Sequence, residues 1–146
     1  MPGRARFKRA GFVVFLIGMA IIVAACASAD HSWQGEFDAR LEGAARTIEG
    51  ALEEAKPGMS PGEYMTTFGP AGNSLFFKSQ LVKELDPPPG CEAVQVKGKA
   101  AVYGAAERIG GAFKNLTPRL ERNFSAMLEE QLALLEKRER EAATCA

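Results

Sequence analysis

The first 25 residues constrain this 146-residue chain more than any other segment. A cluster of basic residues comes first, and an apolar stretch from Gly11 to Ala25 follows without a charged side chain. Basic residues stay on the cytoplasmic side of a membrane, while an apolar helix of this kind enters the bilayer. The stretch has no polar face, so it is unsuited to the surface of a globular domain. This layout predicts an N-terminal export signal.

The apolar stretch ends in Val23-Ala24-Ala25-Cys26, and this ending resembles the lipobox of bacterial lipoprotein precursors. An aliphatic residue, two small residues and an acceptor cysteine stand in the order of that motif, and the resemblance covers residues 1–28. It implies cleavage before Cys26 and acyl chains on that cysteine, which then hold the mature protein at a membrane of the bacterial cell envelope. In a proteobacterium, the absence of Asp directly after the cysteine implies the outer membrane.

Two alternatives for this segment stay open. Ala27-Ser28-Ala29 is an A-x-A site, where ordinary secretory cleavage would give a soluble periplasmic or secreted domain. Without any cleavage, the 19 residues of Gly11–Ala29 just reach the length that spans a bilayer. The lipoprotein interpretation divides the chain into a signal peptide (1–25), a lipidated tether (26–32) and a folded domain (33–146).

The charge of the mature chain differs from that of the precursor. All four basic residues of the signal are lost on cleavage, which leaves 14 Lys and Arg against 18 Asp and Glu, a net charge of −4. A mildly acidic domain argues against nucleic acid as a partner, and against adsorption of the protein surface to anionic lipid. The remaining 121 residues suffice for one domain with one modest core.

Helical patterns dominate the mature chain. Apolar residues recur at steps of three and four from Trp33 to Leu52, which predicts a helix over 33–55. Ser60 and Glu63 form a capping box that opens a short helix, and the turn-forming residues 69–73 separate it from a helix over 74–85. The Pro-rich residues 87–90 form the next break.

The second half of the chain predicts two further helices. Residues 93–97 alternate apolar and polar side chains, which allows a short strand, and helix is favoured from Lys99 to Leu116. The glycines of this segment would let a neighbouring helix approach closely. Thr117 and Pro118 begin the last helix, which runs to about Ala143. The predicted fold is an all-α, up-and-down helical bundle with one short extra helix.

The cysteine count predicts one disulfide. Lipidation of Cys26 leaves Cys91 and Cys145, and an even pair in an oxidising compartment is typical of a disulfide. The turn at 115–118 divides residues 91–145 almost equally. Two antiparallel helices of equal length would therefore bring these two cysteines together at the open end of a hairpin.

Few patterns point to catalysis. The single histidine, His31, lies beside the tether, so it cannot supply a Ser-His or Cys-His pair to the core. Clusters with metal-ligand spacing and heme attachment motifs are both missing, so we expect neither a metal nor a cofactor. The acidic pairs at 53–54 and 129–130 point about 100° apart on a helix, so they do not converge on one substrate atom.

The most distinctive segment of the domain is Phe68–Phe77, which contains three phenylalanines. Core packing is the simpler role for Phe68, Phe76 and Phe77, but those that are exposed would mark a binding patch for a partner or ligand. We therefore expect a non-catalytic envelope lipoprotein that binds an envelope protein or a small apolar ligand. The alternatives are a periplasmic enzyme or enzyme inhibitor, and a structural oligomer formed through the last helix.

Overall fold

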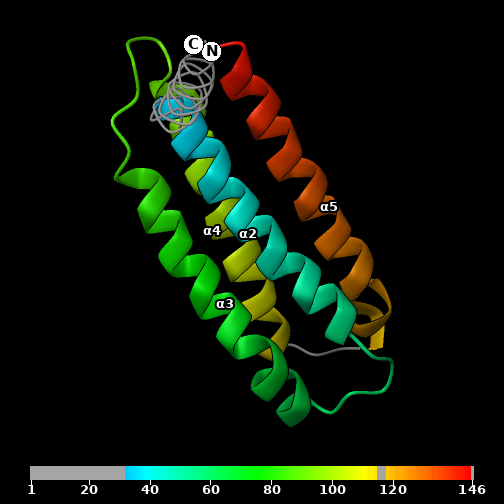
Figure 1. Ribbon diagram of the computed structural model, residues 1–146. Helices are drawn as coiled ribbons and strands as arrows, with labels where there is room; N and C mark the ends of the chain where they lie inside the picture. The colour runs from blue at the N-terminus through cyan, green and yellow to red at the C-terminus, as the bar shows by residue number, and fades with distance from the viewer. Residues whose placement is uncertain (1–31, 115–117, 146) are drawn as a thin grey trace, which may run out of the picture. The chain divides into compact units, whose positions relative to one another are not determined.

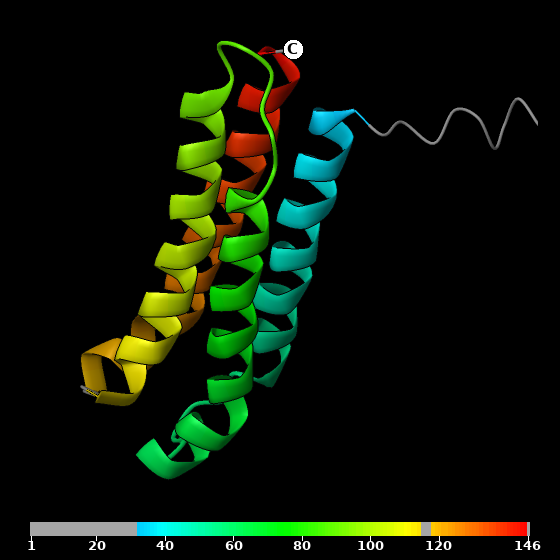
Figure 2. The same ribbon diagram turned by 90° about the vertical axis from the view of Figure 1, so that its left-hand side faces the viewer.

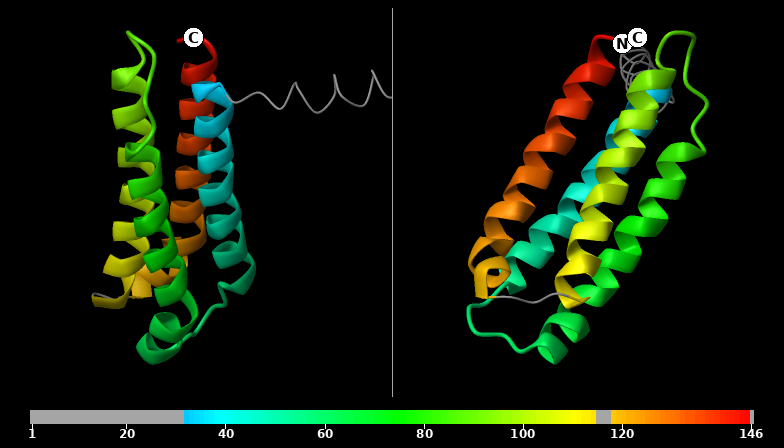
Figure 3. Two further views of the ribbon diagram at one scale, coloured as in Figure 1. Left: turned by 60° about the vertical axis from the view of Figure 1, so that its left-hand side comes forward. Right: turned by 180° about the vertical axis from the view of Figure 1, so that it is seen from behind.

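The computed structural model describes residues 32–114 and 118–145, which form four helices (Figure 1). They are α2 (Trp33–Glu54), α3 (Pro61–Lys83), α4 (Glu92–Lys114) and α5 (Pro118–Ala143). Successive helices run in opposite directions, and α5 returns to pack against α2 (Figures 1 and 3). The prediction of an all-α helical bundle is confirmed. Residues 1–31, and with them the predicted signal peptide and Cys26, lie outside the described residues.

The beginnings of α2 and α3 follow from local hydrogen bonds. The Ser32 hydroxyl accepts a hydrogen bond from the backbone N–H of Gly35 at 3.1 Å and satisfies one free donor at the start of α2. At the start of α3, the Ser60 hydroxyl accepts from the N–H of Glu63, whose carboxylate accepts from the N–H of Ser60. The predicted capping box is therefore confirmed.

One apolar core joins the four helices. Each helix contributes side chains at spacings of three and four residues, so that one face of each is buried. The largest fully buried side chains are Phe37, Leu41, Ile48, Tyr64, Phe68, Leu75, Val82, Val102, Ile109, Phe124, Leu128 and Leu135. Tyr64, Phe68 and Phe124 form an aromatic cluster with ring centroids 5.0–5.3 Å apart, which fastens the first turns of α3 to α5.

The predicted turn at 69–73 is wrong, because α3 is continuous from Pro61 to Lys83 with Pro70 inside it. The buried stripe of α3 passes straight through this segment, with Gly72 lying between Phe68 and Leu75. Burial of that stripe outweighs the local preference for a turn. The first turns of α3 lie at an angle to the rest of the helix (Figure 2), as expected where proline removes one backbone donor and crowds the preceding turn.

The short strand considered for residues 93–97 is also absent, because α4 begins at Glu92. Here a polar residue is buried for a structural purpose. The Gln95 amide donates to the carbonyls of Val82, Lys83 and Leu85 at 2.5–3.1 Å, so it ties the start of α4 to the end of α3. Gln95 therefore lies on the buried face of α4. The alternation of apolar and polar residues at 93–97, which resembles a strand, arises because this buried position is polar.

Small residues bring α4 close to α2. A Cβ atom at Gly98 would overlap the ring of Phe37, so the ring occupies the space that glycine leaves. The predicted close approach is therefore confirmed at Gly98, whereas nothing lies within 4 Å of a Cβ at Gly110 or Gly111. None of the helices among the described residues has the length and apolar character needed to cross a membrane.

Candidate binding face

The large exposed hydrophobic side chains of the described residues all lie on two helices. Their exposed fractions range from 37% to 67%, and they are Met65, Phe76, Phe77, Leu81, Val96 and Tyr103. The first four belong to α3 and the last two to α4. We call this surface the α3–α4 face. An apolar surface shared by two adjacent helices is typical of a binding site rather than of a bundle exterior.

The structure separates the three phenylalanines that the sequence proposed as a binding patch. Phe76 and Phe77 are 44% and 67% exposed, and their ring centroids lie 5.8 Å apart. Phe68 is completely buried in the aromatic cluster with Tyr64 and Phe124, so it cannot belong to a surface patch. Met65 and Tyr103, which the sequence analysis did not name as site residues, join the two exposed phenylalanines on the α3–α4 face.

A groove of about 400 Å³ runs between α3 and α4 on this face. Met65, Phe76 and Tyr103 contribute its large side chains, and the ring centroids of Phe76 and Tyr103 lie 6.1 Å apart. Gly72 lines it as well, and a Cβ there would lie only 3.7 Å from the carbonyl oxygen of Ala106, so the two helices approach closely at this point. The groove is therefore shallow and open, with small residues between apolar walls.

Polar groups in the groove are few. Asn73 and Glu107 line it, and a hydrogen bond from the Tyr103 hydroxyl to Glu107 raises the pKa of that tyrosine. Both side chains come from α4, and the raised pKa keeps the Tyr103 hydroxyl protonated as a hydrogen-bond donor. Apolar and small side chains make up most of its lining.

A second hollow of about 400 Å³ lies where the α3–α4 loop passes the start of α2. Its lining consists of residues 32–34 and the Pro-rich residues 86–89. The indole N–H of Trp33 is buried without a hydrogen-bond partner among the described residues. The Trp33 ring itself stacks on Phe37, with centroids 5.0 Å apart, so its main role is to extend the core toward this end of the bundle.

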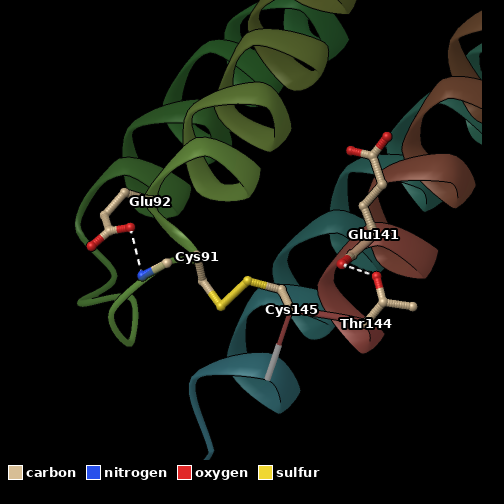
Figure 4. The surroundings of a disulfide bond; sticks show 6 residues. Cys91, Glu92, Glu141, Thr144 and Cys145 are labelled. Atoms are coloured by element: carbon tan, nitrogen blue, oxygen red, sulfur yellow. Dashed lines mark hydrogen bonds between the residues drawn. A yellow bond between two sulfur atoms is a disulfide. The ribbon is translucent and has the colours of Figure 1, made fainter.

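The predicted disulfide between Cys91 and Cys145 is present (Figure 4). The two Cα atoms lie 5.6 Å apart, within the range that the bond requires. Cys91 is completely buried just before α4, and Cys145 follows the last turn of α5. There the hydroxyl of Thr144 donates to the carbonyl of Glu141 at 2.9 Å. The bond joins α4 and α5 at the end of the bundle where α2 begins.

Carboxylates gather on the opposite side of the bundle, between α2 and α5. Burial raises the pKa of Asp38, and a hydrogen bond from Gln34 opposes this change. Burial, together with the charges of Asp38, Glu136 and Glu42, raises the pKa of Glu139, while Arg140 opposes the effect. Within the part of the chain that the structure describes, no three His, Cys, Asp or Glu side chains are grouped closely enough to hold a metal ion.

The apolar stripe of α5 faces the bundle. Phe124, Leu128 and Leu135 are buried, and none of the large exposed hydrophobic side chains found among the described residues belongs to this helix. Among the residues whose burial the structure describes, the large exposed apolar side chains therefore gather on the α3–α4 face. Comparison with known protein families, with curated proteins and with solved structures finds no match for this chain.

Proposed function

We propose that the chain is the precursor of a cell-envelope lipoprotein whose helical domain acts by binding and not by catalysis. Cys26 carries the lipid that holds the mature protein at the membrane. The α3–α4 face receives an apolar partner, which is either an envelope protein or a small apolar ligand. The disulfide between Cys91 and Cys145 suits this proposal, because such bonds persist in the oxidising compartments outside the cytoplasm.

One observation carries the binding function. Six large hydrophobic side chains remain in solvent on α3 and α4, although the same helices bury a complete core stripe on their other sides. Water-exposed apolar surface is unfavourable at roughly 25 cal/mol per Å², so contact with an apolar partner would stabilise the protein. Exposed apolar side chains gathered on neighbouring helices mark a docking area in many soluble proteins.

The anchor is tested by the intact mass of the non-reduced protein recovered from the membrane fraction of a bacterial host. We expect a chain that begins at Cys26, carries acyl groups and lacks two hydrogens because of the disulfide. A chain that begins at Asp30 without lipid would contradict the anchor and make the domain a secreted one. A chain that begins at Met1 would contradict cleavage.

The binding face is tested with an apolar fluorescent dye, anilinonaphthalene sulfonate, and the substitutions Phe76→Ser and Phe77→Ser combined. Phe77 is mostly exposed and Phe76 about half covered, so the double variant should stay folded and lose only about 1–2 kcal/mol of unfolding free energy. The native protein should bind the dye and the double variant should not. Ala126→Ser with Ala133→Ser, on the exposed side of α5, is the matched control. Equal dye binding by the native protein and the phenylalanine variant would contradict the proposed face.

A further inference from the structure

Charge divides the bundle into two unlike sides. By sequence, α2 and α5 together contain twelve acidic and seven basic residues, a net charge of −5. In contrast, α3 and α4 contain three acidic and six basic residues, a net charge of +3. The acidic average of the mature chain therefore hides a basic side, and that side also presents the exposed apolar residues.

The lysines of this side lie among and beside the apolar side chains. No acidic residue occurs between Tyr64 and Lys83 on α3, or between Ala93 and Ala106 on α4. Lys83 follows Phe76 by two helical turns, and Lys99 lies one turn from Tyr103, so each shares a helix line with an exposed aromatic residue. Both lysines therefore belong to the α3–α4 face.

Two further lysines border the face. The Nζ atom of Lys78 lies 3.7 Å from where a Cβ at Gly43 would be, so Lys78 extends toward α2. Lys97 lies near enough to Glu141 of α5 to help lower the pKa of that carboxyl. Basic groups thus stand on both flanks of the apolar surface. Glu107 is the acidic residue in the lining of the groove.

We propose that the α3–α4 face lies on the anionic phospholipid surface of the membrane to which the protein is anchored. The proposal rests on the lipid anchor at Cys26 from the proposed function and names the apolar ligand of that function as membrane lipid. Aromatic and aliphatic side chains bordered by lysine are typical of protein surfaces that lie at the membrane interface. The lysine stems extend past the apolar surface and place their ammonium groups among the phosphates.

The tether makes this contact favourable. Ser32 lies six positions after Cys26, and an extended chain of that length spans at most about 20 Å. The beginning of α2 is therefore held close to the lipid headgroups. A weak surface contact becomes effective under such tethering, because its local concentration is high. The charges fix the orientation, with the basic α3–α4 face toward the anionic lipid and the acidic side of α2 and α5 away from it.

The test is photo-crosslinking of the full chain in the membranes of a bacterial host. Benzoylphenylalanine replaces Phe77 on the face, or Ala133 on the exposed side of α5 as the control position. After irradiation, the masses of the purified products and of their N-terminal peptides are measured. We expect phospholipid adducts from position 77 well above those from position 133, and acyl groups on Cys26 in both proteins.

Charge reversal provides the second measurement. In the position-77 protein, Lys83→Glu with Lys99→Glu should reduce the lipid adduct about fivefold or more, because each lysine near an anionic surface contributes substantially to attraction. Lys56→Glu with Lys137→Glu changes the net charge equally but lies outside the face, and should leave the adduct unchanged. An equal loss in both variants would overturn the assigned orientation.

The other outcomes separate this inference from the proposed function. Adducts at position 77 with a protein of defined mass would overturn the lipid contact and show that the face docks a protein. Acyl groups on Cys26 without lipid adducts above the position-133 control would overturn the lipid contact while leaving the anchor. Lipid adducts on a chain without acyl groups would support the lipid contact and overturn the anchor.

Discussion

The ring of Phe37 fills the space beside Gly98, so position 98 cannot accept a larger side chain without a shift. The ring is completely buried and stacks on Trp33, which leaves it little room to move. We expect Gly98→Ala to lower the unfolding free energy by about 1–2 kcal/mol, because overpacking outweighs the higher helix propensity of alanine. Urea denaturation measures this change.

Two further variants identify the cause of that loss. Gly50→Ala, where nothing lies within 4 Å of the added Cβ, should instead raise stability by about 0.5–1 kcal/mol. Phe37→Leu should cost less in the Gly98→Ala protein than in the native one, because the shorter side chain removes the overlap. A Gly98→Ala protein as stable as Gly50→Ala would contradict this account of the packing.

The carboxyls of Asp38 and Glu139, between α2 and α5, predict that folding stability depends on pH. Each has a raised pKa in the folded state, so each favours folding when protonated. That contribution is complete below the unfolded pKa, near 4, and is lost as the pH rises through the higher folded pKa. Neutralising one carboxyl should therefore stabilise the protein at neutral pH and not in acid.

The variant Asp38→Asn tests this sign. We expect it to unfold with a free energy up to about 0.5 kcal/mol higher at pH 7, because the amide avoids burying a charge and removes the repulsion of Glu139, with no gain near pH 3. Urea unfolding at the two pH values measures both. The lowered pKa values of Glu63 and Glu141 act in the opposite direction but are common to both proteins, so they cancel in the difference. A gain of equal size at both pH values would point to a cause other than charge.

At the scale of elements, helix capping and helical periodicity could be predicted from the sequence, but continuity through Pro70 could not. The local cluster of glycine, proline and asparagine at 69–73 favours a turn in isolation. The residues Phe68, Gly72, Leu75, Ser79 and Val82 nevertheless form one buried stripe at steps of three and four. Gly72 and Ser79 are not hydrophobic, so a hydrophobicity pattern does not reveal this stripe. It can be recognised only in the structure, where α4 packs against it.

Pro70 itself is exposed and contributes no core contact, so α3 gains little from it. We expect Pro70→Ala to raise the unfolding free energy by about 1–3 kcal/mol, because alanine restores a backbone donor and removes crowding within the helix. Thermal and urea unfolding measure the change. A loss of stability would instead show that the bend is needed to place Tyr64 and Phe68 against Phe124.

At the scale of the whole molecule, predicting the candidate site required knowing which phenylalanines are exposed. Phe68, Phe76 and Phe77 look alike in the sequence, and their exposure is decided by which side of α3 faces the core, where the Phe68 ring meets Phe124. Tyr103 joins the site only because α3 and α4 pack as neighbours. The net charge of each helix can be counted from the sequence. The division of the bundle into a basic and an acidic side also requires knowing that α3 packs beside α4 and α2 beside α5.

The disulfide was predicted from the cysteine count, with the equal lengths of the last two helices bringing the pair together, and it should contribute strongly to stability. Its cysteines are separated by 54 positions, and closing a loop of this size removes unfolded-state entropy worth about 4 kcal/mol. For a domain of this size, that is a large part of the total stability. We expect Cys91→Ala with Cys145→Ala to lower the unfolding free energy by about this amount. Urea denaturation measures it.

Reduction and hydrogen exchange show where the loss acts. Reductant should destabilise the native protein by a similar amount and leave the alanine variant unchanged, since only its Cys26 remains. In the reduced protein, amide exchange should accelerate first in the last turns of α5 and the first turn of α4, because the disulfide joins them at the end of the bundle. That end is also where α2 begins, so the bond would hold together the part of the domain nearest the proposed anchor. Equal stability of the oxidised and reduced proteins would mean that packing of Gln95, Ala142 and their neighbours alone holds this end closed.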